Sequence, residues 1–86
     1  IETCCGDASL LQRNTYDVLL ANINRNILLQ DIPTYSLCIR KGGLLFVSGF
    51  YTDDMPMIIG TAMHSGLEYV SHDSIDNWCC IKFRKP

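Results

Sequence analysis

The sequence predicts an α/β fold in which parallel strands, joined by helical crossovers, end in one antiparallel hairpin. Two runs, Val18–Leu20 and Leu44–Val47, are apolar without alternation, as expected of parallel strands covered on both faces. A helical pattern of apolar residues follows each run. Two further strand-like segments, 67–72 and 78–84, are separated by only five residues, too few for a parallel crossover. The last pair must therefore be antiparallel.

The first predicted strand, residues 16–22, runs directly into an Asn-rich turn. Asn22, Asn24 and Asn26 follow one another at alternate positions as the strand ends. Asparagine tolerates unusual backbone angles, caps helices, and offers a ligand both a donor and an acceptor. Because ligands of open α/β sheets bind outside the carboxyl ends of the strands, this turn is the first candidate site.

The segment after this turn carries one apolar helical stripe, formed by Leu28, Ile32, Tyr35 and Ile39. Pro33 interrupts the pattern, which predicts either a kink or two short helices, the second capped by Asp31. Arg40 and Lys41 suit the carboxyl end of a helix, and Gly42 supplies a left-handed stop after them.

The second predicted strand, 44–48, ends at Ser48-Gly49. Glycine allows a neighbouring backbone to come close, and Ser48 offers a hydrogen-bonding group. Since no base stands beside Ser48 in the sequence, it is not predicted to be a nucleophile. Both residues are nevertheless candidates for a substrate pocket at the strand end.

A second helix is predicted after Thr52, Asp53 and Asp54. These residues provide capping oxygens and negative charge for its first turn, a better account than an acid/base pair, and Pro56 is tolerated near its start. Gly66 ends the helix. Its predicted apolar stripe consists of Met55, Ile59 and Ala62, with Ile58 and Met63 beside them.

Composition indicates a small globular piece with an unusually large apolar content. The 86 residues are 48% hydrophobic and 19% charged, so one face is expected to be covered by something else. No apolar run approaches the roughly 20 residues that span a bilayer, and no targeting segment is present. We therefore expect no membrane partner and a cytoplasmic location. The net charge of −2, with a basic cluster only at Lys82, Arg84 and Lys85, predicts no direct nucleic-acid binding.

Neither the cysteines nor the histidines form a recognisable metal or catalytic motif. Cys4-Cys5 and Cys79-Cys80 are adjacent pairs and Cys38 is alone, so no spacing suits a tetrahedral ion, and no metal is predicted. Buried thiols in a reducing compartment explain them better. His64 is expected on the solvent side of a helix and His72 at a strand end, both without a catalytic role.

The order of these features resembles the C-terminal third of the PrmA methyltransferases, the family that modifies ribosomal protein L11. The resemblance rests on the Ala21-Asn22-Ile23 turn, on the run from Lys41-Gly42-Gly43 to Ser48-Gly49, and on the closing strand that begins at Trp78. It implies the C-terminal half of a Rossmann-like methyltransferase sheet, with local strand order 16–22, 44–48, 78–84, 67–72. Residues 1–86 are expected to form a single partial domain.

The resemblance also implies an activity and site residues. The longer parent would transfer a methyl group from S-adenosylmethionine to amino groups, of lysine or of the N-terminus, on a ribosomal protein recruited by a region N-terminal to this chain. Asp7 would lie near the adenine, and Asn22 would face the methyl-bearing sulfonium and orient the incoming amine. No glycine-rich GxGxG-like turn is present, so half of the cofactor site is missing and the 86 residues alone are expected to be inactive.

Two alternatives from other classes stay open. A Rossmann-like methyltransferase acting on a nucleic acid or a small molecule would share the sheet. Nucleic-acid amino methyltransferases usually carry an Asn/Asp-Pro-Pro-aromatic turn where this chain has Ala21–Asn24, and the absence of those prolines disfavours this class. A non-enzymatic α/β binding module would explain the missing glycine-rich loop.

One further prediction concerns self-association. In the family's sheet the 16–22 strand pairs with the 44–48 strand on one side and with an absent strand on the other. Since Val18–Leu20 carries no charge or proline that would protect a bare edge, this edge is predicted to pair with another copy.

Overall fold

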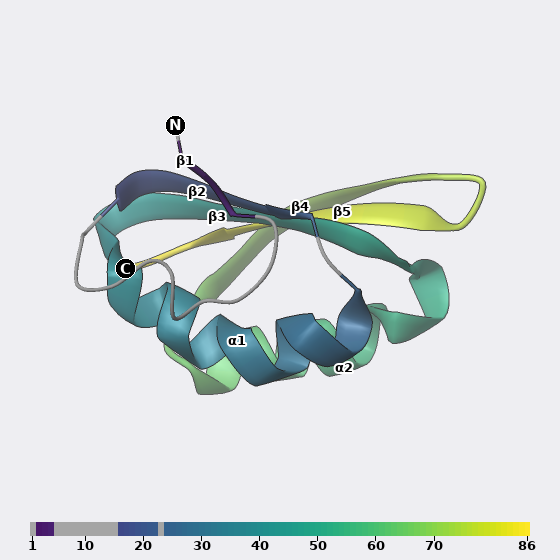
Figure 1. The fold of residues 1–86 in the computed structure, drawn as a ribbon, viewed down its shortest axis with the longest axis horizontal. Coiled ribbons are helices and arrows are strands. Elements are labelled where there is room, and N and C mark those ends of the chain that lie inside the picture. Colours follow the sequence, from purple (N-terminus) through teal and green to yellow (C-terminus); the bar gives the residue numbers. More distant parts are fainter. Residues whose placement is uncertain (1, 5–15, 23) are drawn as a thin grey trace.

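The computed structural model describes residues 2–4, 16–22 and 24–86, which form one mixed sheet with helices against it (Figure 1). The sheet has five strands in the order β1-β2-β3-β5-β4. Pairing is parallel from β1 to β3 and antiparallel in β3–β5 and β5–β4. The predicted α/β class, the antiparallel hairpin and the local strand order are confirmed. The elements are β1 (Glu2–Cys4), β2 (Tyr16–Asn22), α1 (Arg25–Cys38), β3 (Ile39–Tyr51), the 3-10 turn η2 (Thr52–Asp54), α2 (Met55–His64), β4 (Glu68–Ile75) and β5 (Trp78–Arg84).

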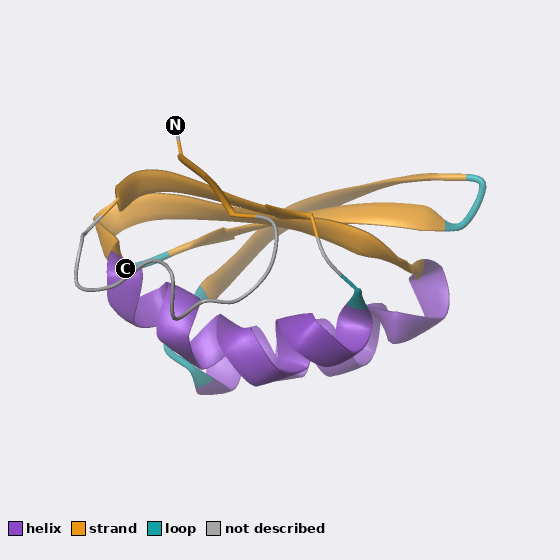
Figure 2. Ribbon diagram, in the orientation of Figure 1, coloured by secondary structure: helices purple, strands orange, loops and turns teal. Residues whose placement is uncertain are grey.

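The core lies between the sheet and the two described helices, which cover the same face (Figure 2). The predicted stripe of α1 faces inward, with Leu28, Ile32 and Tyr35 fully buried. Each large apolar side chain buried in this way contributes about 1.5–3 kcal/mol. From the sheet side, alternate residues of the strands complete the core: Leu19, Ala21, Leu45, Val47, Ile81 and Phe83.

The opposite face of the sheet is not covered by a described helix. Val18, Leu20 and Phe46 lie on it and are half-buried, and the Lys82 ammonium lies 5.8 Å from the centre of the Phe46 ring. The prediction that these strands are covered on both faces is therefore wrong for the described residues. An unbroken apolar run shows that both faces of a strand can be buried. It does not show which element packs on each face.

Helix α1 is continuous from Arg25 to Cys38, so the predicted division into two short helices at Pro33 is wrong. Proline removes one backbone donor, but Pro33 is on the exposed side, and the buried face of α1 holds the helix together around it. Asp31 is a buried residue inside this helix rather than a cap.

The predicted end of α1 at Gly42 is also wrong, because the chain is extended from Ile39 onward. Gly42 does have a left-handed backbone, with φ +83°, but it lies within β3. Its N–H donates to the carbonyl of Lys85 at 2.6 Å, and the N–H of Lys85 donates to the Gly43 carbonyl at 2.9 Å. Pairing with the carboxyl-terminal residues therefore draws this segment into the sheet, and β3 is much longer than the predicted 44–48.

The hairpin is tighter than predicted, since β4 extends to Ile75 and places His72 within the strand rather than at its end. Asp76 and Asn77 alone form the turn, with φ values of 50° and 70°. Two successive positive φ angles match the twist of antiparallel strands. In α2, Met55, Ile58 and Ala62 are buried as predicted and Gly66 follows with φ +90°, whereas Met63 is 58% exposed.

The predicted bare edge of β2 is occupied in this structure. Strand β1 pairs with it in parallel, placing Glu2 opposite Leu19 and Cys4 opposite Ala21. The premise of self-association, a β2 strand with no neighbour on this side, is therefore wrong at Leu19–Ala21, which pair within the chain.

Gly43 is expected to tolerate no side chain. A Cβ atom there would lie 2.6 Å from Ile39 Cγ2 and 2.9 Å from the carbonyl oxygens of Arg40 and Asp17. We expect Gly43→Ala to lower the free energy of unfolding by about 1–3 kcal/mol, as overpacking does. Gly60, on the exposed side of α2 with open space around it, is the control, and Gly60→Ala should raise stability by about 0.5–1 kcal/mol. Urea unfolding compares the two, and equal effects would contradict the close approach of β2 and β3.

Candidate functional site

The carboxyl ends of the parallel strands β2 and β3 lie side by side. Their register pairs Ala21 with Val47 and Asn22 with Ser48. The structure thus brings together two residues, predicted separately from the sequence, that stand 26 positions apart in the chain. This edge is where open α/β sheets bind ligands.

A cleft of about 310 Å³ opens at this edge, between the start of α1 and the end of β3. It is lined by Asn24, Arg25, Asn26, Gly49, Phe50, Tyr51 and Asp54. Gly49, predicted as a pocket residue, has φ +99° and lies where the register between β3 and β5 shifts. A side chain would be strained in that conformation, so glycine shapes the wall of the cleft.

Helix α1 is capped by Asn24 and not by Asn22. The backbone of Asn24 is extended (φ −70°, ψ 164°), and its side-chain oxygen accepts a hydrogen bond from the N–H of Ile27 at 3.0 Å. The side chain of Asn22 is exposed and makes no hydrogen bond to another described residue. Its amide is therefore available to a ligand.

An ion pair between Arg25 and Asp54 joins the two sides of the cleft. The guanidinium lies 3.0 Å from the carboxylate, and the two side chains are 42% and 19% exposed. The same carboxylate accepts a hydrogen bond from the N–H of Tyr51 at 3.4 Å. Because Arg25 is partly solvated, the pair contributes at most about 1 kcal/mol, and its main effect is to fix the position of the turn after β3. Asp54 thus has a structural role, but its predicted capping of α2 is wrong, because its side chain makes no capping bond to that helix and bonds to Tyr51 instead.

Sequence reasoning missed Arg25 and Tyr51 as parts of this site. Arg25 and Asp54 are 29 positions apart, so no local spacing signals their pairing. The only hint is that Arg25 sits within the Asn-rich turn.

Cys80 lies on β5 directly opposite Ser48. Burial raises the pKa of its thiol, and Asp73 and Cys79 raise that pKa further. The thiol is therefore protonated at neutral pH and is not a nucleophile. The raised pKa of Cys80 contributes to the free energy of unfolding. This contribution is fully present below the unfolded-state pKa of the thiol and is lost as the pH rises from there through its folded-state pKa.

The other predicted residues are separate from the cleft. His64 is the exposed last residue of α2, and His72 lies within β4, where its Nδ1 is hydrogen bonded to the hydroxyl of Tyr69. Asp7 lies outside the described residues. Cys38 and Cys79 are buried, as predicted. In the described part of the chain, no three His, Cys, Asp or Glu side chains gather as a metal would require, and no helix is long and apolar enough to cross a membrane.

Comparison with known proteins decides the family. The family model described as ribosomal protein L11 methyltransferase (PrmA) matches residues 3–86. The chain belongs to the PrmA family. The predicted resemblance is thereby confirmed over nearly the whole sequence.

Individual relatives agree with this assignment. The ribosomal protein L11 methyltransferase of Phocaeicola vulgatus is 49% identical over 79 residues, which make up 91% of this chain and 28% of that protein. The corresponding protein of Porphyromonas gingivalis is 43% identical over 84 residues, 96% of this chain and 29% of its own length. The chain thus spans less than a third of the curated relatives that it matches.

Solved structures confirm the fold. The ribosomal protein L11 methylase of Lactobacillus delbrueckii subsp. bulgaricus superposes with a TM-score of 0.78 at 23% identity, covering 85% of this chain and 38% of that one. The N-methyltransferase NodS of Bradyrhizobium japonicum, solved with S-adenosyl-L-homocysteine, gives a TM-score of 0.63 at 18% identity, covering 94% and 52%. At these identities, the likeness shows the Rossmann-like methyltransferase sheet alone.

Substituting Asn22 and Asn24 one at a time should show which of them caps helix α1 and which is available to a ligand. Asn24→Ala removes the acceptor of the Ile27 N–H and should lower the free energy of unfolding by about 1 kcal/mol. Asn22→Ala removes an exposed amide without a described partner and should change it by less than about 0.5 kcal/mol. Chemical denaturation measures both. A larger loss for Asn22→Ala would mean that this residue holds the turn rather than a ligand.

Proposed function

We propose that residues 1–86 form a single partial domain, the C-terminal part of the methyltransferase domain of a longer enzyme. This enzyme is cytoplasmic and methylates a ribosomal protein. The enzyme transfers methyl groups from S-adenosylmethionine to amino groups, of lysine or of the N-terminus. The observation that carries the proposal is the exposed amide of Asn22 beside Ser48 at the ends of β2 and β3, in a chain of the PrmA family. The ribosomal protein is recruited by a region outside this chain.

The described residues fit one side of a cofactor site. The exposed amide of Asn22, the hydroxyl of Ser48 and the glycine at position 49 lie at the strand ends, next to a cleft of about 310 Å³. When bound, S-adenosylmethionine supplies a methyl group that its positively charged sulfur makes electrophilic. The adenine contact of Asp7 is proposed from the family resemblance. Gly49 lines the cleft on the β3 side, and Ser48, which precedes it, is proposed as a further substrate-pocket residue.

In this proposal Asn22 acts by positioning. Its side-chain carbonyl accepts a hydrogen bond from the N–H of the incoming amine and directs the nitrogen lone pair toward the methyl group. Alignment of this kind is worth several orders of magnitude in rate. The amine must be neutral, and a polar pocket lined by carbonyl oxygens binds the neutral N–H groups while water takes the released proton.

Methyl transfer of this kind does not depend on a catalytic dyad. Cys80, opposite Ser48, is protonated at neutral pH because burial raises its pKa, so a covalent intermediate on it is disfavoured. Direct displacement at an activated methyl group needs no protein nucleophile. The residues at this edge therefore have to bind and orient the acceptor amine. The amide of Asn22 and the hydroxyl of Ser48 can do both by hydrogen bonding.

The 86 residues alone should bind S-adenosylmethionine weakly, with a dissociation constant above about 1 mM, since ribose and methionine contacts expected of a glycine-rich turn are missing. Calorimetric titration of the isolated chain measures this. Micromolar affinity would show that the described edge holds the cofactor without the rest of the parent.

In the full-length parent, Asn22→Ala should lower the turnover rate roughly 10- to 1000-fold, in the range of one lost positioning contact, with a smaller effect on cofactor affinity. Transfer of labelled methyl groups to the protein substrate and titration of the cofactor measure the two effects. Gln30→Ala, an exposed amide on α1, serves as the control and should leave turnover unchanged. Unchanged turnover in Asn22→Ala would remove this residue from the mechanism.

A further inference from the structure

Two aromatic residues form an exposed pair beside the candidate site. Tyr51, the last residue of β3, lies opposite Trp78, the first residue of β5. Their ring centres are 5.7 Å apart, nearly perpendicular at 85°, and the residues are 59% and 48% exposed. An edge-to-face pair of this kind is a favourable contact, yet both rings still present surface to solvent.

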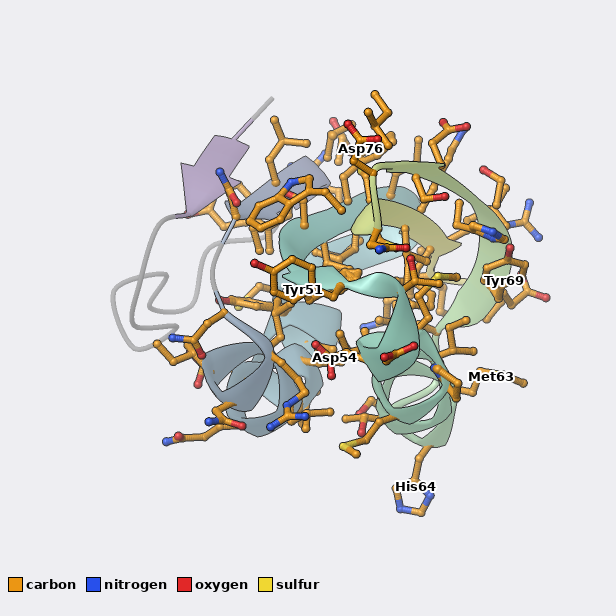
Figure 3. The ribbon with its side chains drawn as sticks, turned by 90° about the vertical axis from the view of Figure 1, so that its right-hand side faces the viewer. Tyr51, Asp54, Met63, His64, Tyr69 and Asp76 are labelled. Carbon is orange, nitrogen blue, oxygen red and sulfur yellow. The ribbon has the colours of Figure 1, made fainter. Side chains whose placement is uncertain are left out.

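A hollow of about 320 Å³ lies next to this pair, lined by Tyr51, Thr52, Asp53, Asp54 and Asn77. It shares Tyr51 and Asp54 with the cleft at the end of β2 and β3, so the two adjoin. Figure 3 looks onto this end of the molecule, where Tyr51 lies between Asp76 and Asp54 in the view. We call Tyr51, Asp53, Asp76 and Trp78 the aromatic–acidic rim.

The rim is held in place by the hairpin turn. The N–H and the hydroxyl of Thr52 both donate to the carbonyl of Asn77, at 2.9 and 3.3 Å. These bonds fasten the tip of the β4–β5 hairpin, which extends beyond the helices in Figure 1, to the end of β3. The rings and carboxylates therefore keep their relative positions, which favours binding because little order has to be imposed on them.

Basic residues are sparse at the rim end of the sheet. Asp53, Asp54 and Asp76 lie at the rim end, and Arg25, already paired with Asp54, is the only described Lys or Arg near them. Neither Asp53 nor Asp76 forms an ion pair with a described residue. The remaining described cations lie where β3 begins or toward the end of β5: Arg40, Lys41, Lys82, Arg84 and Lys85.

We propose that the aromatic–acidic rim binds the ammonium group of a lysine in a basic polypeptide, next to the amine that is methylated. This inference rests on the proposed function and names the chemistry by which the substrate is held. Exposed aromatic faces attract ammonium groups by about 0.5–1 kcal/mol, and more when desolvated. Unpaired carboxylates beside them add attraction and steer a basic chain toward this end of the sheet. An anionic partner would be repelled.

The test uses the full-length parent and a 12-residue peptide of alternating lysine and alanine, roughly the size of a segment that could span both cleft and rim. The comparison peptide carries acetyl-lysine at every lysine position and so has no ammonium groups. Binding is measured by calorimetry at about 20 and 200 mM salt, a range over which screening of exposed charges changes strongly. The wild type should bind the lysine peptide more tightly than the acetylated one, and more tightly at low salt.

Rim variants should weaken this binding by about 5- to 30-fold, the equivalent of about 1–2 kcal/mol. Trp78→Leu removes the indole face, and Asp53→Asn with Asp76→Asn removes the two carboxylates. Trp78→Phe keeps an aromatic face and should retain most of the affinity. Asp17→Asn with Glu68→Gln also removes two carboxylates, at the opposite end of the sheet, where they pair with Arg40 and Arg84, and should have little effect.

The asparagine double variant keeps the test decisive if Trp78→Leu does not fold. Equal binding of the two peptides, or unchanged binding in both kinds of rim variant, would overturn the proposal.

Methyl transfer is measured separately. For a substrate protein, rim variants should raise KM more than they lower kcat. A wild-type parent that binds the lysine peptide but methylates no amine would instead refute the proposed function, so the two failures are distinguishable.

Discussion

The in-register parallel pairing of β2 and β3 is the constraint on which the rest of the structure depends. It sets Asn22 opposite Ser48, so that the polar ends of the two strands meet at one edge. The pairing requires close backbone approach at its other end, where Gly43 leaves no room for a Cβ beside the carbonyl of Asp17. Helix α1 spans the distance between the strands and buries its apolar stripe on them, which ties the helix start to the same edge.

Two polar contacts then assemble the site around that edge. Arg25 and Asp54 link the start of α1 to the turn after β3, and Thr52 links that turn to the hairpin at Asn77. None of these contacts contributes much stability by itself, since all are partly solvated. Their effect is geometric, because they hold the cleft, the rim and the exposed amide of Asn22 at one end of the sheet.

Patterns that report burial predicted much of this arrangement. The apolar runs of β2 and β3, the stripe of α1 and the short hairpin connection predicted the elements and the antiparallel hairpin, whereas the strand order came from the family resemblance. The ends of the strands indicated Asn22, Ser48 and Gly49 as candidate site residues. Predictions from single residues failed where distant parts of the chain intervene: the buried face of α1 carries the helix past Pro33, and the pairing of Gly42 with Lys85 turns a predicted helix stop into a strand. The ion pair of Arg25 and the contact of Tyr51 with Trp78 have no local signature, since each joins residues more than 25 positions apart.

The central claim is that the exposed amide of Asn22 directs the acceptor amine. A crystal structure of the full-length parent with S-adenosyl-L-homocysteine and a lysine-containing segment of its protein substrate tests this most directly. The account predicts the acceptor nitrogen within about 3 Å of the side-chain oxygen of Asn22, on the line toward the cofactor sulfur. An acceptor nitrogen held elsewhere, with Asn22 facing solvent or bonded only to the backbone of its own turn, would contradict it.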